Sequence, residues 1–271
     1  MTDRYGVIGN PIEHSKSPQI HARFAAESQA DMRYARLWAP EAHFDAVAAA
    51  FLAGGGHGMN VTVPFKEAAH AFADTCSERA QAAGAVNTLR AEPDGSCYGD
   101  NTDGIGLLRD LRRNHGVAVA GRRLLLLGAG GAARGLLPSL LAEGPSELVI
   151  ANRTVARAEA LAEGRGVTRA CGLEDLAGAR FEVVINTTAA GLQGEMPPLP
   201  EDVMGTDGAA YDLVYAERET PFMAWARSQG AAQVCDGLGM LVEQAAESFY
   251  LWRGVYPSTR PVIEALRRGA G

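Results

Sequence analysis

The stretch Leu124-Leu125-Leu126-Leu127-Gly128-Ala129-Gly130-Gly131-Ala132-Ala133 decides the fold of this chain of 271 residues. Four consecutive leucines predict a buried strand. The residues after them follow the pattern G-x-G-x-x-A, which predicts a tight turn that opens a helix. Because strand, glycine turn and helix onset come in the order of the dinucleotide-binding fingerprint, the stretch predicts a Rossmann-type α/β domain.

The turn itself predicts a binding site for a pyrophosphate group. Gly128, Ala129, Gly130, Gly131 and Ala132 carry small side chains or none, so the backbone can approach the phosphates closely. The N–H groups at the helix start suit the negative charge of the phosphates. A plain glycine turn is the alternative interpretation. The strand before the turn and the helix after it favour the dinucleotide site.

The next predicted strand, residues 147–151, indicates which dinucleotide binds. It ends in Asn152-Arg153-Thr154, and Arg157 follows shortly afterwards. An acidic residue at the strand end would accept a hydrogen bond from the ribose 2′-hydroxyl of NAD, whereas guanidinium groups pair with the 2′-phosphate of NADP. A solvated basic turn would explain one arginine but not the missing acid. The residues therefore predict NADP.

A second α/β unit is predicted before this one. Strands and helices alternate in a βαβαβ pattern, which favours a mainly parallel sheet covered by helices. The predicted strands are 5–9, 34–37, one around Asn60, 86–91 and 97–100, and the predicted helices are 18–28, 44–52 and one from Gly104. Later strands are predicted at 182–186, 209–214 and 232–235, and a last helix at 241–254.

These elements predict an α/β fold of two domains with a cleft between them. The domain break is expected at Asp103-Gly104, and the chain is expected to return to the first domain near Met240. The first domain would then comprise residues 1–103, completed by 240–271, and would bind the substrate. Residues 104–239 would form the Rossmann-type NADP-binding domain.

Composition excludes several classes of function. The net charge of −7, with no basic block, argues against binding to nucleic acid or to anionic membranes. No segment is apolar for long enough to predict a signal peptide or a membrane span. The four cysteines, Cys76, Cys97, Cys171 and Cys235, are scattered, which supports neither a metal site nor disulfides and predicts reduced thiols in a cytoplasmic protein.

The stretch Asn60-Val61-Thr62-Val63-Pro64-Phe65-Lys66 predicts a polar site in the first domain. Asn60 and Thr62 alternate with apolar residues, so in a strand their side chains project from one face. Proline then ends the strand, and Lys66 is expected in the first turn of a helix. An amide, a hydroxyl and an ammonium together suit a small, hydroxylated anion. A buried strand that leads to a surface lysine is the alternative.

Further polar residues stand in short motifs that each have a simpler explanation. Ser15 and Ser17 precede a helix expected at Pro18 and could be helix caps. Asn87 is predicted inside an apolar strand, where a buried amide needs partners. Asp103 lies in an Asx-rich turn, and Gln244 lies on a mostly apolar helix.

Taken together, these motifs resemble the shikimate dehydrogenase family in order and spacing from about Tyr5 to Gly254. The motifs are H-S-x-S-P, N-x-T-x-P-x-K, G-A-V-N-T, N-T-D-G, G-A-G-G-A, N-R-T and G-L-x-M-L-x-x-Q. The resemblance implies that Ser15 and Ser17 bind the substrate carboxylate and that Lys66 and Asp103 are the catalytic pair. It implies further substrate contacts from Asn60, Thr62, Asn87, Asp103, Tyr215 and Gln244, and a nicotinamide end lined by Leu213, Gly237 and Met240.

The resemblance also implies the reaction, which is the reversible reduction of 3-dehydroshikimate to shikimate by NADPH in aromatic amino acid biosynthesis. Lys66 would protonate the developing alkoxide and Asp103 would orient it, so no metal is required. The implied partner is this small-molecule substrate, and the protein is expected to be a monomer or a homodimer. The sequence departs from relatives at Ala189, where they carry serine, and at Glu217, where they carry proline.

Three alternatives remain open at this point. An NAD-using quinate/shikimate dehydrogenase would share the fold, but Arg153 and Arg157 argue against NAD. A non-catalytic NADP-binding regulator should have lost Lys66 or Asp103, and both are present. A methylene-tetrahydrofolate-type dehydrogenase is disfavoured because two serines at a helix start suit a small carboxylate better than a folate.

Overall fold

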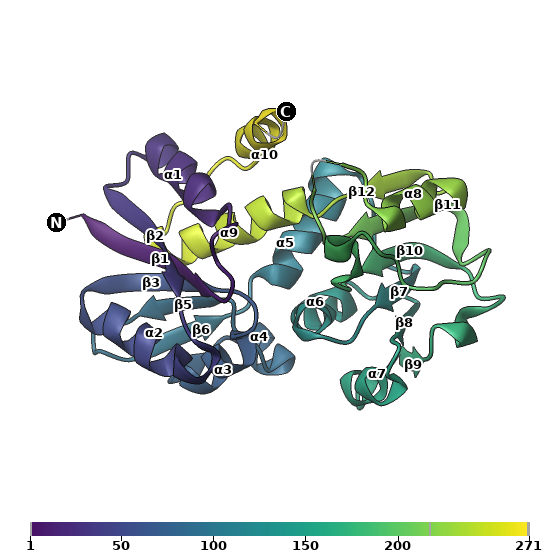
Figure 1. Cartoon of the computed structure of the whole chain (residues 1–271), viewed down its shortest axis with the longest axis horizontal. Coiled ribbons are helices and arrows are strands. Elements are labelled where there is room, and N and C mark those ends of the chain that lie inside the picture. The colour runs from purple at the N-terminus through teal and green to yellow at the C-terminus, as the bar shows by residue number, and fades with distance from the viewer. Residues whose placement is uncertain (1, 217, 270–271) are drawn as a thin grey trace. The chain divides into compact units, whose positions relative to one another are not determined.

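The computed structural model describes residues 2–216 and 218–269. The departure noted at Glu217 therefore lies outside the described residues. The chain divides into two compact units, one that runs to Gly106 and resumes at Leu241–Gly269, and one of Leu107–Met240. The two breaks expected from the sequence lie close to these boundaries. Each unit contains its own sheet (Figure 1).

Unit 1 is an α/β unit with a mixed, mainly parallel sheet in the order β2-β1-β3-β5-β6-β4. Strand β5 is antiparallel to both of its neighbours, and the other pairs are parallel. The strands are β1 (Asp3–Gly9), β2 (Met32–Trp38), β3 (Gly56–Val61), β4 (Thr75–Cys76), β5 (Thr88–Ala91) and β6 (Cys97–Asp100). The helices are α1 (Ser17–Ser28), η1 (Glu41–His43), α2 (Phe44–Ala53), α3 (Lys66–Phe72), α4 (Glu78–Ala83) and α10 (Arg260–Arg268).

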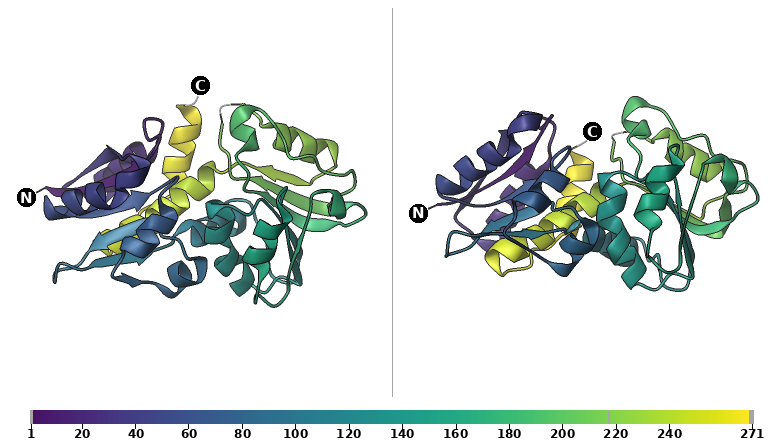
Figure 2. Two further views of the ribbon diagram at one scale, coloured as in Figure 1. Left: turned by 60° about the horizontal axis from the view of Figure 1, so that its bottom comes forward. Right: turned by 90° about the horizontal axis from the view of Figure 1, so that it is seen from below.

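Helices cover both faces of the sheet of unit 1 (Figure 2). On one face, side chains of α2, α3 and α4 pack against Ile8, Val61 and Leu89 of the sheet. On the other face, α1 contacts helix α9 (Leu238–Arg253) through Phe24 and Phe249, whose ring centroids are 5.7 Å apart. Helix α9, which the sequence predicted at 241–254, therefore completes the core of unit 1.

Unit 2 has the topology of the dinucleotide-binding fold, which confirms the Rossmann-type prediction. Its strands pair in parallel in the order β9-β8-β7-β10-β11-β12, and this is the 3-2-1-4-5-6 order of that fold. The strands are β7 (Arg123–Leu127), β8 (Glu147–Ala151), β9 (Thr168–Cys171), β10 (Phe181–Asn186), β11 (Met204–Asp212) and β12 (Gln233–Cys235). The helices are α5 (Asp103–Arg109), which begins in unit 1, the π-helical turn η2 (Asp110–Asn114), α6 (Gly131–Ala142), α7 (Val155–Ala162), η3 (Glu174–Leu176), η4 (Ala190–Gln193) and α8 (Pro221–Ser228).

The four leucines of β7 explain how this sheet is buried. Leu124 and Leu126 join the core under α6 and α7, whereas Leu125 and Leu127 join the core on the opposite face, which α8 covers. None of the four is more than 1 % exposed. Successive side chains of a strand point to opposite faces, so a strand buried on both sides must be apolar at every position.

The structure corrects several predicted boundaries. Strand β5 begins at Thr88, so Asn87 lies immediately before the strand rather than inside it. Strand β11 ends at Asp212 rather than at Val214, because the Asp212 carboxylate accepts the backbone N–H of Val214 and turns the chain. Helix α9 begins at Leu238, three residues before the predicted start at Leu241.

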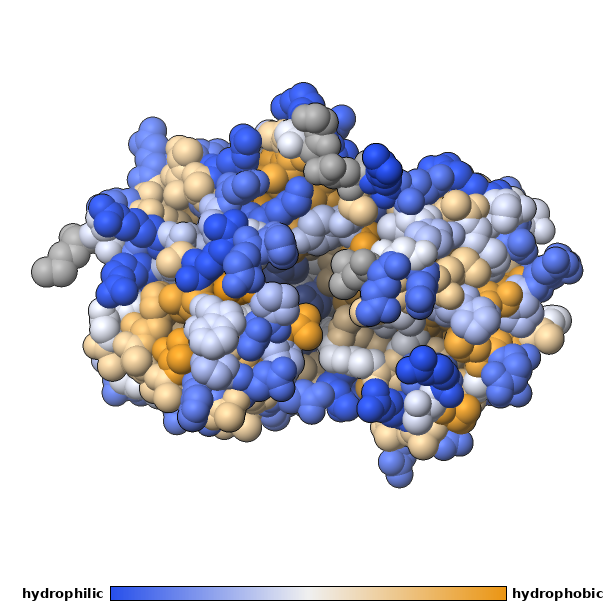
Figure 3. Space-filling view, in the orientation of Figure 1, coloured by the Kyte–Doolittle hydropathy of each residue, from blue (hydrophilic) through white to orange (hydrophobic). Residues whose placement is uncertain are grey.

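Hydrophilic and apolar side chains are mixed on the face of the molecule that Figure 3 shows, with the hydrophilic ones over much of its area. Within the described part of the chain, no helix is both long and apolar enough to cross a membrane. The same residues contain no cluster of histidine, cysteine or carboxylate side chains that could bind a metal ion.

Candidate functional site

An ion pair connects the two residues predicted to be catalytic. Lys66 is the first residue of α3, directly after the turn that follows β3, and Asp103 is the first residue of α5. Lys66 Nζ donates to Asp103 Oδ2 at 2.6 Å. The lysine side chain is 19 % exposed and the aspartate side chain 8 %. Both groups thus lie in a sheltered place that a small ligand can still reach.

Asn87 fixes the other oxygen of this aspartate. Asn87 Nδ2 lies 2.9 Å from Asp103 Oδ1, and Asn87 Oδ1 accepts the backbone N–H of Thr102 at 2.8 Å. A backbone N–H can only donate, so the contact with Thr102 determines which way the amide of Asn87 faces. Asp103 is therefore held between a lysine ammonium and an oriented amide.

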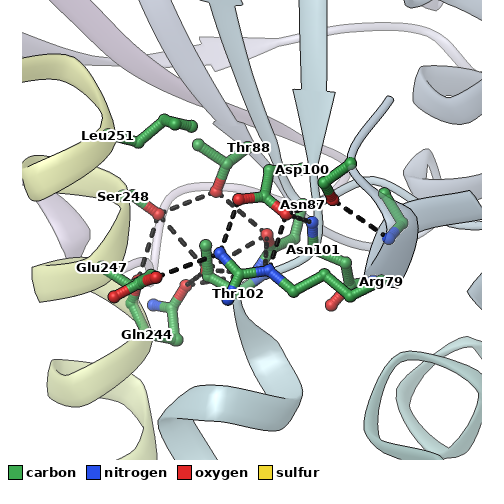
Figure 4. A network of polar contacts seen from close by, with 12 residues as sticks. Arg79, Asn87, Thr88, Asp100, Asn101, Thr102, Gln244, Glu247, Ser248 and Leu251 are labelled. Carbon is green, nitrogen blue, oxygen red and sulfur yellow. Dashed lines mark hydrogen bonds and ion pairs between the residues drawn. The ribbon is translucent and has the colours of Figure 1, made fainter. Parts of the chain in front are cut away.

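Helix α9 contributes two polar side chains to the same place (Figure 4). Gln244 Oε1 lies 3.3 Å from Asn87 Nδ2, and Gln244 Nε2 donates to the Leu241 carbonyl at 2.8 Å. One turn later, Ser248 Oγ lies 3.3 Å from Thr102 Oγ1. The structure thus brings Lys66, Asn87, Asp103 and Gln244 together as predicted, although Gln244 lies far from the others in sequence.

A buried ion pair supports the loop that precedes Asp103. The guanidinium of Arg79 donates to both carboxylate oxygens of Asp100, at 2.7 and 2.6 Å, and also contacts Glu247 of α9 at 3.1 Å. Burial raises the pKa of Asp100, but the bonds from Arg79 and Ser77 outweigh it and leave that pKa below its usual value. Asp100 is therefore an ionised anchor for the strand end.

Side chains that were not predicted hold the amide of Asn60. Its Oδ1 accepts the Tyr34 hydroxyl at 2.7 Å and lies 3.2 Å from His21 Nε2. Its Nδ2 donates to Ser248 Oγ at 2.9 Å and lies 3.2 Å from Thr88 Oγ1. None of these four side chains is a predicted ligand contact, and together they occupy both ends of the amide. These side chains therefore fix the orientation of the Asn60 amide.

The two serines lie at the start of α1, which begins at Ser17 rather than at Pro18. Ser15 Oγ lies 3.2 Å from Ser17 Oγ and accepts the backbone N–H of Ser17 at 3.3 Å. Arg36 donates to the Ser15 carbonyl at 2.7 Å and holds this turn in place. Hydroxyls and the N–H groups of a helix start point to anion binding. Thr62, half-buried, follows the end of β3.

In unit 2, the glycine turn fits a pyrophosphate. Gly128 has a φ of +99°, a backbone conformation that favours glycine, and it lies next to the Thr187 hydroxyl. A side chain at Gly130 or Gly131 would meet open space, so a ligand can approach the backbone at the N-terminus of α6. The turn also lies at the carboxyl ends of β7 and β10, where the strand order reverses and dinucleotides bind in this fold.

A pocket of about 350 Å³ adjoins this turn. Gly128, Asn152 and Arg153 line it, and Arg153 and Arg157 are both exposed. Among the residues that the structure describes, neither guanidinium has an acidic partner. Both arginines can therefore receive a phosphate. Ala189, the position of the departure noted in the sequence, also lines the pocket.

The residues predicted at the nicotinamide end lie together in unit 2. A Cβ atom added at Gly237 would overlap the carbonyl oxygen of Leu213, so the two backbones are in direct contact. Met240 follows in the first turn of α9. Tyr215, also in unit 2, is half-buried, and burial raises the pKa of its hydroxyl.

Several residues of these two sites were not predicted. In unit 1 they are the supports Tyr34, Arg79, Thr88, Asp100, Thr102 and Ser248. In unit 2 they are the pocket residues Leu173, Gln193, Glu195, Met196, Pro197 and Pro198. The motif N-T-D-G did contain Thr102, and a threonine inside an Asx-rich turn could have indicated it. Asp100 belongs to the same stretch, and the others lie on elements that are far apart in the sequence.

Comparison with known proteins identifies the family. Residues 7–89 match the shikimate dehydrogenase substrate binding domain, residues 111–193 the shikimate/quinate 5-dehydrogenase family, and residues 237–267 the shikimate 5′-dehydrogenase C-terminal domain. Shikimate dehydrogenase (NADP(+)) of Halorhodospira halophila is 74 % identical over 270 residues, with all of both chains covered. The corresponding protein of Alkalilimnicola ehrlichii is 58 % identical, with 98 % of this chain and 99 % of the relative covered.

A solved structure agrees with the sequence comparison. Shikimate 5-dehydrogenase of Thermus thermophilus, in complex with NADP(H) and shikimate, superposes with a TM-score of 0.89 at 36 % identity. The match covers 98 % of this chain and 99 % of that one. This chain therefore belongs to the shikimate dehydrogenase family.

Proposed function

We infer that this chain is an NADP-dependent shikimate dehydrogenase, which interconverts 3-dehydroshikimate and shikimate in the biosynthesis of aromatic amino acids. The observation that supports this function most directly is the ion pair of Lys66 and Asp103, with the amides of Asn87 and Gln244 beside it. Relatives that match the full chain are NADP(+) shikimate dehydrogenases, and one related structure contains both NADP(H) and shikimate.

In this function Lys66 is the general acid of the reduction and the general base of the reverse reaction. When the ring ketone is reduced, its carbon accepts a hydride and its oxygen accepts a proton from the Lys66 ammonium; the reverse reaction returns the proton to Lys66 Nζ. Asp103 holds the ammonium in place through Oδ2 and can accept a ring hydroxyl. Asn87 keeps this carboxylate oriented through Oδ1.

The remaining substrate contacts follow from the polar groups of unit 1 and from Tyr215. We assign the carboxylate to Ser15 and Ser17, because their hydroxyls and the N-terminus of α1 converge. Ring hydroxyls are assigned to Asn60, Thr62, Asn87, Asp103 and Gln244, and Tyr215 is assigned to the carboxylate. Tyr34, Thr88 and Ser248 hold the amide of Asn60 in place.

The cofactor site is assigned to unit 2. NADPH supplies the hydride when it is bound. Gly128, Ala129, Gly130, Gly131 and Ala132 would hold its pyrophosphate at the start of α6. Its 2′-phosphate is assigned to Asn152, Arg153, Thr154 and Arg157, and its nicotinamide end to Leu213, Gly237 and Met240.

An absorbance assay at the reduced-nicotinamide band tests this function. Purified protein should reduce NADP with shikimate much faster than it reduces NAD with shikimate, or NADP with quinate. Equal rates with both nucleotides would contradict the cofactor assignment, and a higher rate with quinate would make this a quinate dehydrogenase. No reduction with any of these pairs would refute the proposed function.

We also propose that the protein acts in the cytoplasm as a monomer or a homodimer. Sedimentation of the purified protein would distinguish the monomer from the dimer.

A further inference from the structure

A buried carboxylate lies beside the first turn of α9, outside the residues assigned above. Asp110 is the first residue of η2, and only 1 % of it is exposed. Tyr211, fully buried on β11, donates its hydroxyl hydrogen to Asp110 Oδ2 at 2.6 Å. A carboxylate this deeply buried requires such donors, because burial of an unpaired charge is strongly unfavourable.

The same pair of residues packs against the start of α9. Tyr211 and Met240, which lies in the first turn of the helix, belong to one buried cluster. A Cβ atom added at Gly239 would overlap Asp110 Oδ1, so the carboxylate lies directly against this turn. The first N–H groups of a helix have no partner within it, and a helix N-terminus favours negative charge. The charge of Asp110 therefore favours the start of α9, where the first N–H, that of Leu238, donates to Asp236 Oδ1.

Two other groups keep Asp110 ionised. Asn114 Nδ2 donates to Asp110 Oδ1 at 2.7 Å, and His115 Nε2 lies 3.5 Å from Oδ2. The bond to Asp110, followed by one to Cys235, raises the pKa of His115 to about 10, so the imidazole is charged at neutral pH. Burial raises the pKa of Asp110, but the bonds from His115, Tyr211 and Asn114 outweigh it and lower that pKa.

The turn beside Asp110 carries the residues assigned to the nicotinamide. Met240 shares a buried cluster with Tyr211, and Gly237 packs on the backbone of Leu213, two residues after Tyr211 on the same chain segment. We propose that Asp110 is a positioning residue for hydride transfer. Its carboxylate, held by Tyr211, lies against Gly239 and fixes the first turn of α9, and with it the place of Gly237 and Met240. The proposal rests on the proposed function, because it takes these two residues to line the nicotinamide end.

Tyr211→Phe tests the proposal, because it keeps the ring and removes only the hydroxyl that holds the Asp110 carboxylate in place. Misplacement of reacting groups by an ångström costs up to about a hundredfold in rate, so kcat for shikimate oxidation should fall roughly tenfold to a hundredfold. The Michaelis constant for shikimate should stay within about twofold, since its contacts are untouched. With shikimate deuterated at the carbon that loses hydride, the isotope effect on kcat should rise, because hydride transfer becomes slower than product release.

Asn114→Ala is the matched control. It removes a bond to the same carboxylate but leaves the contacts with Tyr211 and the first turn of α9. It should lower the melting temperature and leave kcat and the isotope effect unchanged. Asp110→Asn, which keeps the size of the side chain and removes its charge, should behave like Tyr211→Phe. A folded Tyr211→Phe protein with normal kcat and an unchanged isotope effect would overturn the proposal.

Calorimetry with two ligands gives a readout that does not depend on turnover. NADP contains the nicotinamide, whereas 2′,5′-ADP lacks it. Tyr211→Phe should weaken the binding of NADP and leave that of 2′,5′-ADP unchanged. If the unaltered protein failed to oxidise shikimate but this difference still appeared, the proposed function would fall and the positioning role would stand. Equal weakening of both ligands would show a general structural role and refute the proposal.

Discussion

Arg79 and Asp100 form a two-pronged ion pair in which the Nε and Nη2 groups of the arginine each donate to a different oxygen of the carboxylate. The Asp100 side chain is 4 % exposed and that of Arg79 is 28 % exposed. Because Arg79 also contacts Glu247, this one side chain connects the loop before Asp103 with the helix that carries Gln244. The pair therefore supports two of the assigned substrate contacts at once.

Arg79→Met should destabilise the protein by about 3 kcal/mol or more, because it leaves a buried carboxylate without its cation. The loss should be larger at neutral pH than in acid. The folded-state pKa of Asp100 is lowered, so the stability it contributes is present above the unfolded pKa of about 3.9 and is lost as pH falls through the folded value. Urea unfolding of both proteins at neutral and acid pH measures the difference.

Arg90→Met is the control for this prediction. Arg90 pairs with Glu92 at 2.6 Å, but both side chains are more exposed than Asp100, so the change should cost about 1 kcal/mol or less. Equal losses in the free energy of unfolding for Arg79→Met and Arg90→Met would mean that burial of the pair of Arg79 and Asp100 adds no stability.

Lys66→Met should lower kcat by roughly 10²–10⁴-fold, the usual contribution of a general acid–base group. The Michaelis constant for shikimate should change much less, because Asn87 and Gln244 remain in place. Steady-state shikimate oxidation measures both constants, and thermal melts check the fold. Glu67→Gln, at the exposed next residue of α3, should leave both constants unchanged. Near-normal turnover of folded Lys66→Met would remove the proposed proton transfer.

Arg153→Ala should raise the Michaelis constant for NADP at least about tenfold, because a charge-assisted bond is worth roughly 1.5–3 kcal/mol. The constant for NAD should not rise, since NAD has no 2′-phosphate. Arg180→Ala is a suitable control, because Arg180 is an exposed arginine of the same unit that faces Asp202 instead of the pocket. An effect of the same size with both nucleotides would argue against a contact with the 2′-phosphate.

Replacement of both Ser15 and Ser17 by alanine should weaken shikimate binding by roughly 1–2 kcal/mol or more, the scale of a hydrogen bond to a charged group. Calorimetry gives the affinity directly. Ser28→Ala provides the comparison, because this hydroxyl lies at the other end of α1 and donates to the Phe24 carbonyl. Unchanged shikimate affinity in the double variant would leave the two serines with the role of helix caps.

The sequence predicted best what depends on neighbouring residues. The strand, turn and helix onset around Gly128 are encoded within a dozen residues, and the structure has them where they were expected. Lys66 likewise opens α3 directly after the proline turn, as predicted. Strands β4 and β9 were missed because Thr75–Cys76 and Thr168–Cys171 are short and carry no apolar run. Partners across the sheet, not local propensity, make them strands.

The supports of the site were not predictable for a related reason. Nothing near Asn60 in sequence indicates that Ser248 will accept from its amide, because the two residues are 188 positions apart. The motif therefore identified Asn60 but not the side chains that hold its amide. The hydrogen bond between Tyr211 and Asp110 was not predictable either, because the two residues are 101 positions apart.

Helix α9 has a consequence for the order in which the protein can fold during synthesis. Unit 1 holds most of the early residues, but Ser248 and Phe249 of α9 complete its polar network and its apolar core. These residues leave the ribosome only after all of β7 to β12 has been made. The Rossmann-type unit, although second in the chain, can therefore fold first. At that stage Ser248, a partner of the Asn60 amide, has not yet been made.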